Sequence, residues 1–230
     1  MLVVSNIDLP TSLHIMKPTA FLNSSIKDFT LNLNNDYRYL KTSYYVSTHA
    51  EVLGNHVIPS SESIIDASRT PILLLRASKA GIPTLRYVVT GSVKQIILEL
   101  GFPLVVFAVN PFCYDGFIVA QNKSALYRAV KSLSMNYKFA VCAQPLKGQM
   151  ISFKSFFGKC KIEGEVAKLS MRVFEVFKLP MCKLHVQTVG NEAYLCGLQP
   201  LRLEEISPAD VEMVSQEVSR MSSKGEHLVG

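Results

Sequence analysis

The chain has 230 residues, of which 48% are hydrophobic and 18% charged, and its formal net charge at pH 7 is +6. It is long enough to bury a core, and its composition is that of a globular protein on the apolar side. No apolar run approaches the ~20 residues of a membrane-spanning helix, so we expect no membrane association.

Positive charge is dispersed along the sequence rather than gathered in one block. The densest zone contains Lys147, Lys154, Lys159 and Lys161. A basic surface attracts nucleic acid, but the sequence has no RNA-binding or helix-turn-helix signature. We therefore interpret these lysines as a solvated polar face and keep a basic nucleic-acid-binding module as the last alternative.

The cysteines stand among apolar neighbours. There are five: Cys113, Cys142, Cys160, Cys182 and Cys196. None forms a Cys-x-x-Cys pair, and no histidine has zinc-finger spacing from a cysteine pair. The odd number and the apolar surroundings indicate reduced, buried thiols in a cytoplasmic protein. A catalytic thiol would need a neighbouring base, which no feature of the sequence supplies.

The N-terminal stretch alternates strand and helix patterns. Residues 2–5 and 29–33 have the apolar composition of short strands. Between residues 37 and 53, tyrosines and aliphatic side chains recur at helical spacing, and a glycine follows where a helix C-cap is expected. Residues 57–59 are then predicted to form a strand, and a serine cluster predicts a short helix that ends at Ile65.

A hairpin forms the centre of the chain. Residues 104–109 are an apolar, β-branched run that predicts a buried strand, and residues 117–120 are a second apolar run. Asn110-Pro111 breaks the first strand and Asp115-Gly116 turns the chain. The loop of this hairpin is therefore placed to lie over a ligand.

Helices and strands alternate on both sides of the hairpin. Helices are predicted at residues 72–80, 92–100, 124–132, 165–177 and 209–221. Extended segments are predicted at residues 83–89 and 139–143, and hairpins at residues 151–162, turning at Gly158-Lys159, and 183–198, turning at Gly190-Asn191.

This order of elements predicts an α+β fold, with a small N-terminal α/β domain and a core whose sheet is partly antiparallel. A shift in the sequence near residues 65–70 marks the boundary. The predicted domains are residues 1–68 and 69–222, and residues 223–230 are predicted to form a flexible tail.

Two segments carry a resemblance to one family. The first runs from Asn32 to Ile64 and contains Asn32-Leu33, Tyr37-Arg38-Tyr39, Tyr44-Tyr45-Val46-Ser47, Gly54 and Pro59-Ser60. In this order and spacing, it resembles the N-terminal domain attached to RimK-like ATP-grasp ligases.

The second segment, residues 69–200, looks like a shortened ATP-grasp core. Its matching parts are Gly81-Ile82-Pro83 at a helix end, residues 101–106 and 116–119 in the nucleotide hairpin, residues 139–146 in the adenine-contacting strand, and residues 183–200 in the strands that end in the metal site. The resemblance covers most of the chain and implies an ATP-grasp-like second domain.

The resemblance implies a demanding chemistry. ATP-grasp ligases activate a carboxylate as an acyl phosphate, which an amine then attacks, and the phosphates need cations, glycines and Mg²⁺ held by oxygen ligands. Several matching positions differ here: Phe107 replaces a lysine, residues 110–113 replace the glycine-rich loop, Pro145 replaces a carboxylate, His185 replaces an aspartate, and Gly197 and Gln199 replace a Glu-x-Asn metal pair. Losing these electrostatic groups together predicts that phosphoryl transfer is absent or very weak.

Four residues remain as candidates for a nucleotide site. They are Arg69 near the first phosphate-binding position, Gly116 in the hairpin, and Gln144 and Leu146 at the adenine strand. Arg69 has an equal alternative as a solvated side chain before a helix, and Gln144 as a polar group at a strand end. The resemblance assigns no catalytic residue and no metal ligand. We therefore expect weak ATP binding at most, with Mg²⁺ only in company with ATP.

These features together predict a divergent RimK-like ATP-grasp protein that is catalytically impaired and acts through contacts with a protein partner or with further copies of itself. The tyrosines that face out at helical spacing would form the partner patch. These are drawn from Tyr37, Tyr39, Tyr44 and Tyr45. The alternative is an active ATP-dependent carboxylate–amine ligase that makes a glutamyl or peptide bond with rearranged ligands.

Overall fold

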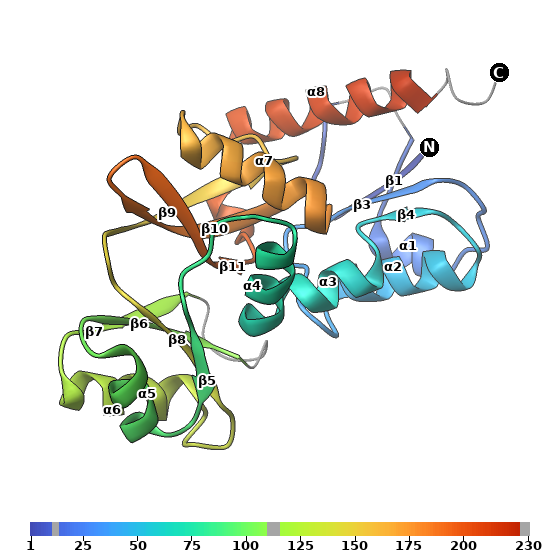
Figure 1. Cartoon of the computed structure of the whole chain (residues 1–230). Coiled ribbons are helices and arrows are strands. Elements are labelled where there is room, and N and C mark those ends of the chain that lie inside the picture. The colour runs from blue at the N-terminus through green and yellow to red at the C-terminus, as the bar shows by residue number, and fades with distance from the viewer. Residues whose placement is uncertain (11–13, 110–115, 226–230) are drawn as a thin grey trace.

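A computed structural model describes residues 1–10, 14–109 and 116–225. Within these residues the strands form three sheets, and helices pack on each of them (Figure 1). The loop predicted at residues 110–115 and the end of the predicted tail, residues 226–230, lie outside the described ranges. None of the helices in these ranges combines the length and hydrophobicity required to cross a bilayer.

The N-terminal sheet is parallel. Its strand order is β2 (Ile15–Met16), β1 (Leu2–Ser5), β3 (Thr30–Leu33) and β4 (Val57–Ile58). Helices α1 (Pro18–Leu22) and α2 (Thr42–Val52) lie in the connections between these strands and share an apolar core with the sheet. The side-chain amide of Asn32 fixes α2 to β3, because it donates to the carbonyl of Ser43 and to Oγ of Ser47, both at 2.7 Å.

The helix predicted at residues 37–53 begins later, at Thr42. Tyr37 is buried ahead of it, where its hydroxyl donates to the carbonyl of Asn32 (2.8 Å) and accepts from the backbone N–H of Asn34 (3.0 Å). Leu40 has a φ of 62°, which is incompatible with a right-handed helix. Buried hydrogen bonds therefore hold this segment as a turn, although its side-chain spacing is helical.

The middle sheet is antiparallel. Its strand order is β5 (Val88–Thr90), β8 (Val141–Pro145), β6 (Leu104–Ala108) and β7 (Phe117–Ala120), so the predicted central hairpin is confirmed as β6 and β7. Helices α5 (Val93–Leu100) and α6 (Lys123–Leu133) cover one face of the sheet and share a core with it. Phe107 and Cys142 belong instead to the largest core, which the middle sheet shares with the third sheet.

The third sheet has the order β11 (Glu192–Gln199), β10 (Met181–Val189) and β9 (Gln149–Phe156), all antiparallel. Helix α3 (Ser61–Ala67) leads into α4 (Thr70–Lys79), and α4 and α7 (Glu165–Phe177) pack against β11. The predicted hairpin at residues 183–198 is confirmed as β10 and β11.

The prediction of a hairpin at residues 151–162 is wrong, because β9 is a single strand that pairs with β10. Phe157 and Gly158 both have positive φ and turn the chain as expected, but only the Phe156–Lys159 bridge follows. The backbone N–H of Phe157 donates to the carbonyl of Pro180 (2.7 Å), which continues the β10 pairing instead. Lys159 then forms an ion pair with Glu217, which draws the returning segment towards the C-terminal helix.

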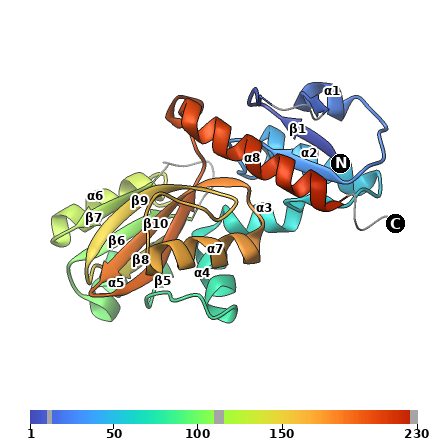
Figure 2. The same ribbon diagram turned by 90° about the horizontal axis from the view of Figure 1, so that it is seen from above.

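The C-terminal helix α8 (Pro208–Gly225) follows a short 3₁₀ turn, η1 (Leu203–Glu205), and crosses above the third sheet towards the N-terminal sheet (Figure 2). Ser215 Oγ donates to the carbonyl of Pro10 (2.9 Å), and Val214 and Val218 are buried in the largest core. The helix extends three residues into the predicted tail. The α+β fold class is confirmed, and the domain boundaries stay a prediction.

Candidate nucleotide-binding site

The candidate site lies where the β6–β7 hairpin of the middle sheet covers β10 of the third sheet. Phe107 from β6 and Phe117 from β7 are in ring contact, with centroids 5.6 Å apart. Both also contact the imidazole of His185 on β10, at 5.9 and 5.2 Å. Three rings therefore fill the space between the two sheets at this point.

The ring of Phe107 lies directly against the backbone of Gly197 on β11. A Cβ atom placed on Gly197 would lie 2.6 Å from Cε1 and 2.9 Å from Cδ1 of Phe107. Carbon atoms in van der Waals contact are about 3.5–4.0 Å apart, so the ring occupies the space that any other side chain at position 197 would need. Phe107 is only 3% exposed.

A chain of hydrogen bonds runs beside these rings. Ser152 Oγ lies 2.7 Å from His185 Nδ1, and His185 Nε2 lies 2.7 Å from Gln199 Oε1. An amide oxygen only accepts, so with this amide orientation Nε2 carries the proton and Nδ1 accepts from the hydroxyl of Ser152. The three side chains therefore satisfy one another.

Burial lowers the pKa of His185 to about 4, against a smaller raising effect of the bond to Gln199. The ring is thus neutral at physiological pH. Transfer of the Ser152 proton would create a buried imidazolium with no carboxylate to stabilise it, and the ammonium of Lys183 opposes that charge. The Ser–His–Gln chain therefore holds the site in place and is poorly suited to activating the serine.

Next to this chain is a pocket of about 320 Å³. It is lined by residues of β9, β10, η1 and α8, including Lys154, Lys183, Glu205 and Asp210. The acids are already engaged, since Lys183 pairs with Glu205, and Lys154 pairs with Asp210. Burial opposes ionisation of Asp210, but the bonds from Lys154 and Ser207 outweigh it and lower the pKa.

Three of the four lysines in the most basic zone of the sequence pair with acids of α8, and the third of them, Lys161, lies 3.9 Å from Asp210. Lys154 pairs with Asp210 and Lys159 pairs with Glu217. Within the described ranges, no group of three or more His, Cys, Asp or Glu side chains is arranged to hold a metal ion. Burial also raises the pKa of the Cys182 and Cys196 thiols to about 12, so these cysteines are not nucleophiles.

Most polar groups at the strand end predicted to contact adenine form internal hydrogen bonds, although Oε1 of Gln144 is buried without a partner among the described residues. Gln144 is fully buried, and its amide donates to the carbonyl of Cys196 (2.7 Å). The N–H of Leu146 donates to the carbonyl of Pro103 (2.9 Å). Gln187 on β10 accepts from the N–H of Lys147 (2.8 Å) and donates to the carbonyl of Pro145 (3.0 Å).

The other two predicted residues lie elsewhere. Arg69 is the N-cap of α4, and its guanidinium bonds the carbonyl of Ile65 (3.0 Å) and the carboxylate of Asp66 (3.2 Å). Gly116 directly precedes β7 and has a φ of 113°. Gln144 and Leu146 are therefore brought together by β8, whereas Arg69 is held by its own neighbours. A nucleotide-binding role for these four residues stays a prediction.

Sequence reasoning missed Ser152 and Gln187. Gln187 could have been found from strand periodicity, because Lys183, His185 and Gln187 alternate along β10 and so share one face. Ser152 lies opposite His185 in the β9–β10 register. That register depends on the pairing of β9, which the sequence pattern assigned to another hairpin.

The arrangement of three sheets is that of the ATP-grasp fold. D-alanine–D-alanine ligase from Bacillus anthracis, solved in complex with ATP, has a TM-score of 0.64 at 16% identity, with 98% of each chain covered. A RimK-domain ATP-grasp protein from Sphaerobacter thermophilus has a TM-score of 0.62 at 15% identity, covering 94% of this chain and 98% of that one. The ATP-grasp ligase PsnB, complexed with Mg and ADP, has a TM-score of 0.63 at 12% identity, covering 96% and 97%.

The amino-acid sequence identifies the family of the chain. The chain belongs to the family described as RimK-like ATPgrasp N-terminal domain, whose model matches residues 20–217. This confirms the resemblance found in the sequence. No curated protein sequence matches the chain.

Proposed function

We propose that this protein is a catalytically silent ATP-grasp protein, which binds nucleotide weakly at most and acts by contacting a partner protein. The observation that carries the proposal is the packing of Phe107 against Gly197. These two positions match a lysine and a metal-binding glutamate in the family. An aromatic ring and a glycine without a side chain thus occupy the positions where a phosphate-binding cation and a Mg²⁺ ligand are expected.

The remaining metal positions support the same reading. His185 and Gln199 are bonded to each other, and His185 is also bonded to Ser152. Mg²⁺ prefers oxygen ligands in near-octahedral geometry, usually with one or two carboxylates. A buried imidazole and a neutral amide do not fit that requirement, so these residues are not a site for Mg²⁺ bound to ATP.

The adenine end supports it as well. Adenine recognition at a strand end uses free backbone donors and acceptors, but the N–H groups of Leu146 and Lys147 and the carbonyl of Pro145 are already bonded. A nucleotide would have to displace Gln187 and leave its amide buried without partners. An unsatisfied buried polar group costs about 1–3 kcal/mol.

An active ligase with rearranged ligands has one feature in its favour. The pocket beside Ser152 is lined by three lysines and two carboxylates. Among the described residues, its lining comes from β9, the connection between β9 and α7, β10, η1 and α8, not from the β6–β7 hairpin. Both carboxylates are held by lysines, and Asp210 is fully buried. These ion pairs favour a structural role for Lys154, Lys183, Glu205 and Asp210.

Thermal melting with ATP, with and without Mg²⁺, tests the proposal. At 1 mM ATP, a site with a Kd of about 10 µM would add about 2.7 kcal/mol of stability, or roughly 5–10 °C for a chain of this size. A Kd near 1 mM would add only about 0.4 kcal/mol. We expect a shift of about 1 °C or less, together with no phosphate release when amino acids are added.

An active ATP-grasp ligase assayed in parallel provides the positive control. A Mg²⁺-dependent shift above about 5 °C, accompanied by phosphate release with amino acids, would favour the active ligase and reject the proposal.

A further inference from the structure

The outer side of α6 and the segment that follows it form an exposed surface. Leu126, Ala129, Val130 and Leu133 face the middle sheet and are buried. The opposite side of the helix and the next turn expose Tyr127, Arg128, Lys131, Tyr137, Lys138 and Phe139. We call these six residues the α6 surface. Its three aromatic side chains are 45–50% exposed.

The segment after α6 is held in an unfavourable backbone conformation. Met135, Asn136 and Tyr137 have φ values of 53°, 57° and 62°. Left-handed conformations are strained for residues other than glycine, and less so for asparagine. Buried Ser134 compensates, since its Oγ accepts from the N–H of Tyr137 (2.7 Å) and its carbonyl accepts from the N–H of Phe139 (3.0 Å).

This conformation presents Tyr137, Lys138 and Phe139 as consecutive exposed side chains. Because the backbone is fixed before binding, a partner that uses these side chains loses little additional conformational entropy. The packing of the core does not require a strained turn that exposes three side chains. Loops that display side chains on a rigid scaffold are common binding elements.

The charge of the surface has one sign. Residues 121–140 contain Lys123, Arg128, Lys131 and Lys138 and no aspartate or glutamate. In the described part of the chain, none of these four cations forms an ion pair. This contrasts with Lys154 and Lys159, which α8 neutralises.

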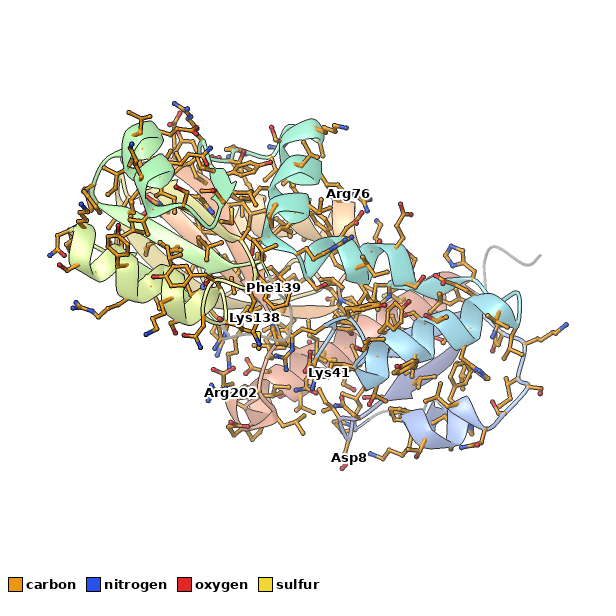
Figure 3. All side chains as sticks on the ribbon, turned by 90° about the horizontal axis from the view of Figure 1, so that it is seen from below. Asp8, Lys41, Arg76, Lys138, Phe139 and Arg202 are labelled. Carbon is orange, nitrogen blue, oxygen red and sulfur yellow. The ribbon has the colours of Figure 1, made fainter. Side chains whose placement is uncertain are left out.

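Apolar side chains accompany these cations. Helix α5 lies beside α6 on the same outer face (Figure 1) and carries Leu98, which is 83% exposed. Figure 3 shows Lys138 and Phe139 on one face of the molecule, with Lys41 and Arg202 from other parts of the chain on that same face. Contiguous exposed apolar groups bounded by cations are typical of protein interaction sites.

We infer that the α6 surface docks an acidic protein segment that carries apolar side chains. The inference rests on the proposed partner-binding role. The cations provide complementary charge, and the aromatic residues provide the anchors that dominate protein interfaces. Nucleic acid fits less well, since binding of single strands relies on stacking of bases on aromatic rings, whereas the exposed Leu98 offers an aliphatic contact of the kind that protein partners provide.

Fluorescence anisotropy with a labelled 16-residue peptide of alternating Glu and Leu tests the inference on the full chain. The double variant Lys131→Glu/Lys138→Glu should bind at least tenfold more weakly, and Tyr137→Ala about tenfold more weakly. The control is Lys27→Glu/Lys79→Glu, which changes net charge equally at two exposed lysines outside this surface and should leave the affinity unchanged. Circular dichroism melts of each variant verify folding.

Two results would overturn the inference. One is equal loss of affinity in both double variants, which would indicate binding to net charge alone. The other is tighter binding of a single-stranded oligonucleotide of equal charge, lost in Lys131→Glu/Lys138→Glu, which would make this a nucleic-acid surface. Neither readout involves ATP, so failure here is distinguishable from failure of the proposed silent nucleotide site.

Discussion

Replacing Gly197 with alanine should destabilise the protein through a clash with Phe107. The added Cβ would lie 2.6, 2.9 and 3.2 Å from three atoms of the Phe107 ring. Gly197 has no positive φ, so backbone strain does not contribute. Both residues are buried, and the ring has packed neighbours that limit its movement.

The expected magnitude follows from the packing. Overfilling a close-packed site costs about 1–3 kcal/mol, and Phe107→Ala alone should cost about 3–5 kcal/mol because it leaves a cavity. In the double variant the new methyl group enters that cavity. The combined loss should therefore be smaller than the sum of the two single losses by about 1–3 kcal/mol.

Urea unfolding of the wild type, both single variants and the double variant measures this coupling. Gly91→Ala is the matched control, since its Cβ would meet nothing closer than 3.9 Å and φ is not positive; its effect should stay within about 0.5 kcal/mol. Strictly additive losses at positions 107 and 197 would refute the reasoning that the ring fills the space above the glycine.

Two further predictions concern buried polar groups. The pKa of His185 is lowered from 6.5 to about 4. As the pH falls, this histidine therefore takes up a proton in the unfolded chain at a higher pH than in the folded protein. Between pH 7.5 and 5, His185 should thus lower the free energy of unfolding by about 2 kcal/mol. NMR titration of the ring checks this, and a midpoint near 6.5 would contradict it; His185→Gln should lose that part of the pH dependence. Asp210→Asn should cost about 2–3 kcal/mol in urea unfolding, less than for a fully buried pair because Lys154 is 28% exposed. Asp8→Asn is the control, since the ion pair of Asp8 with Lys17 is exposed and its removal should cause no measurable loss of stability. Equal losses of stability in Asp210→Asn and Asp8→Asn would contradict the stabilising role given to the Lys154–Asp210 pair.

Local patterns predicted most elements because each depends on neighbouring residues. The amphipathic spacing of residues 165–177 and the turn at Gly190-Asn191 are examples, and both elements appear where expected. The helix prediction for the segment around Tyr37 was wrong because the buried Tyr37 hydroxyl bonds back to the preceding strand, at Asn32, and this bond overrides the helical spacing. The β9 hairpin failed because its true partner, β10, lies more than twenty residues further along the chain.

The amino-acid sequence by itself determined the family and the uncharged residue types at positions 107, 197 and 199. Residue identity fixes which charges a position can carry, whatever the fold. Only the tertiary structure decided what these residues contact, since the Phe107–Gly197 contact and the Ser152–His185–Gln199 chain join strands distant in sequence. Packing between sheets is a property of three-dimensional proximity, and no local pattern encodes it.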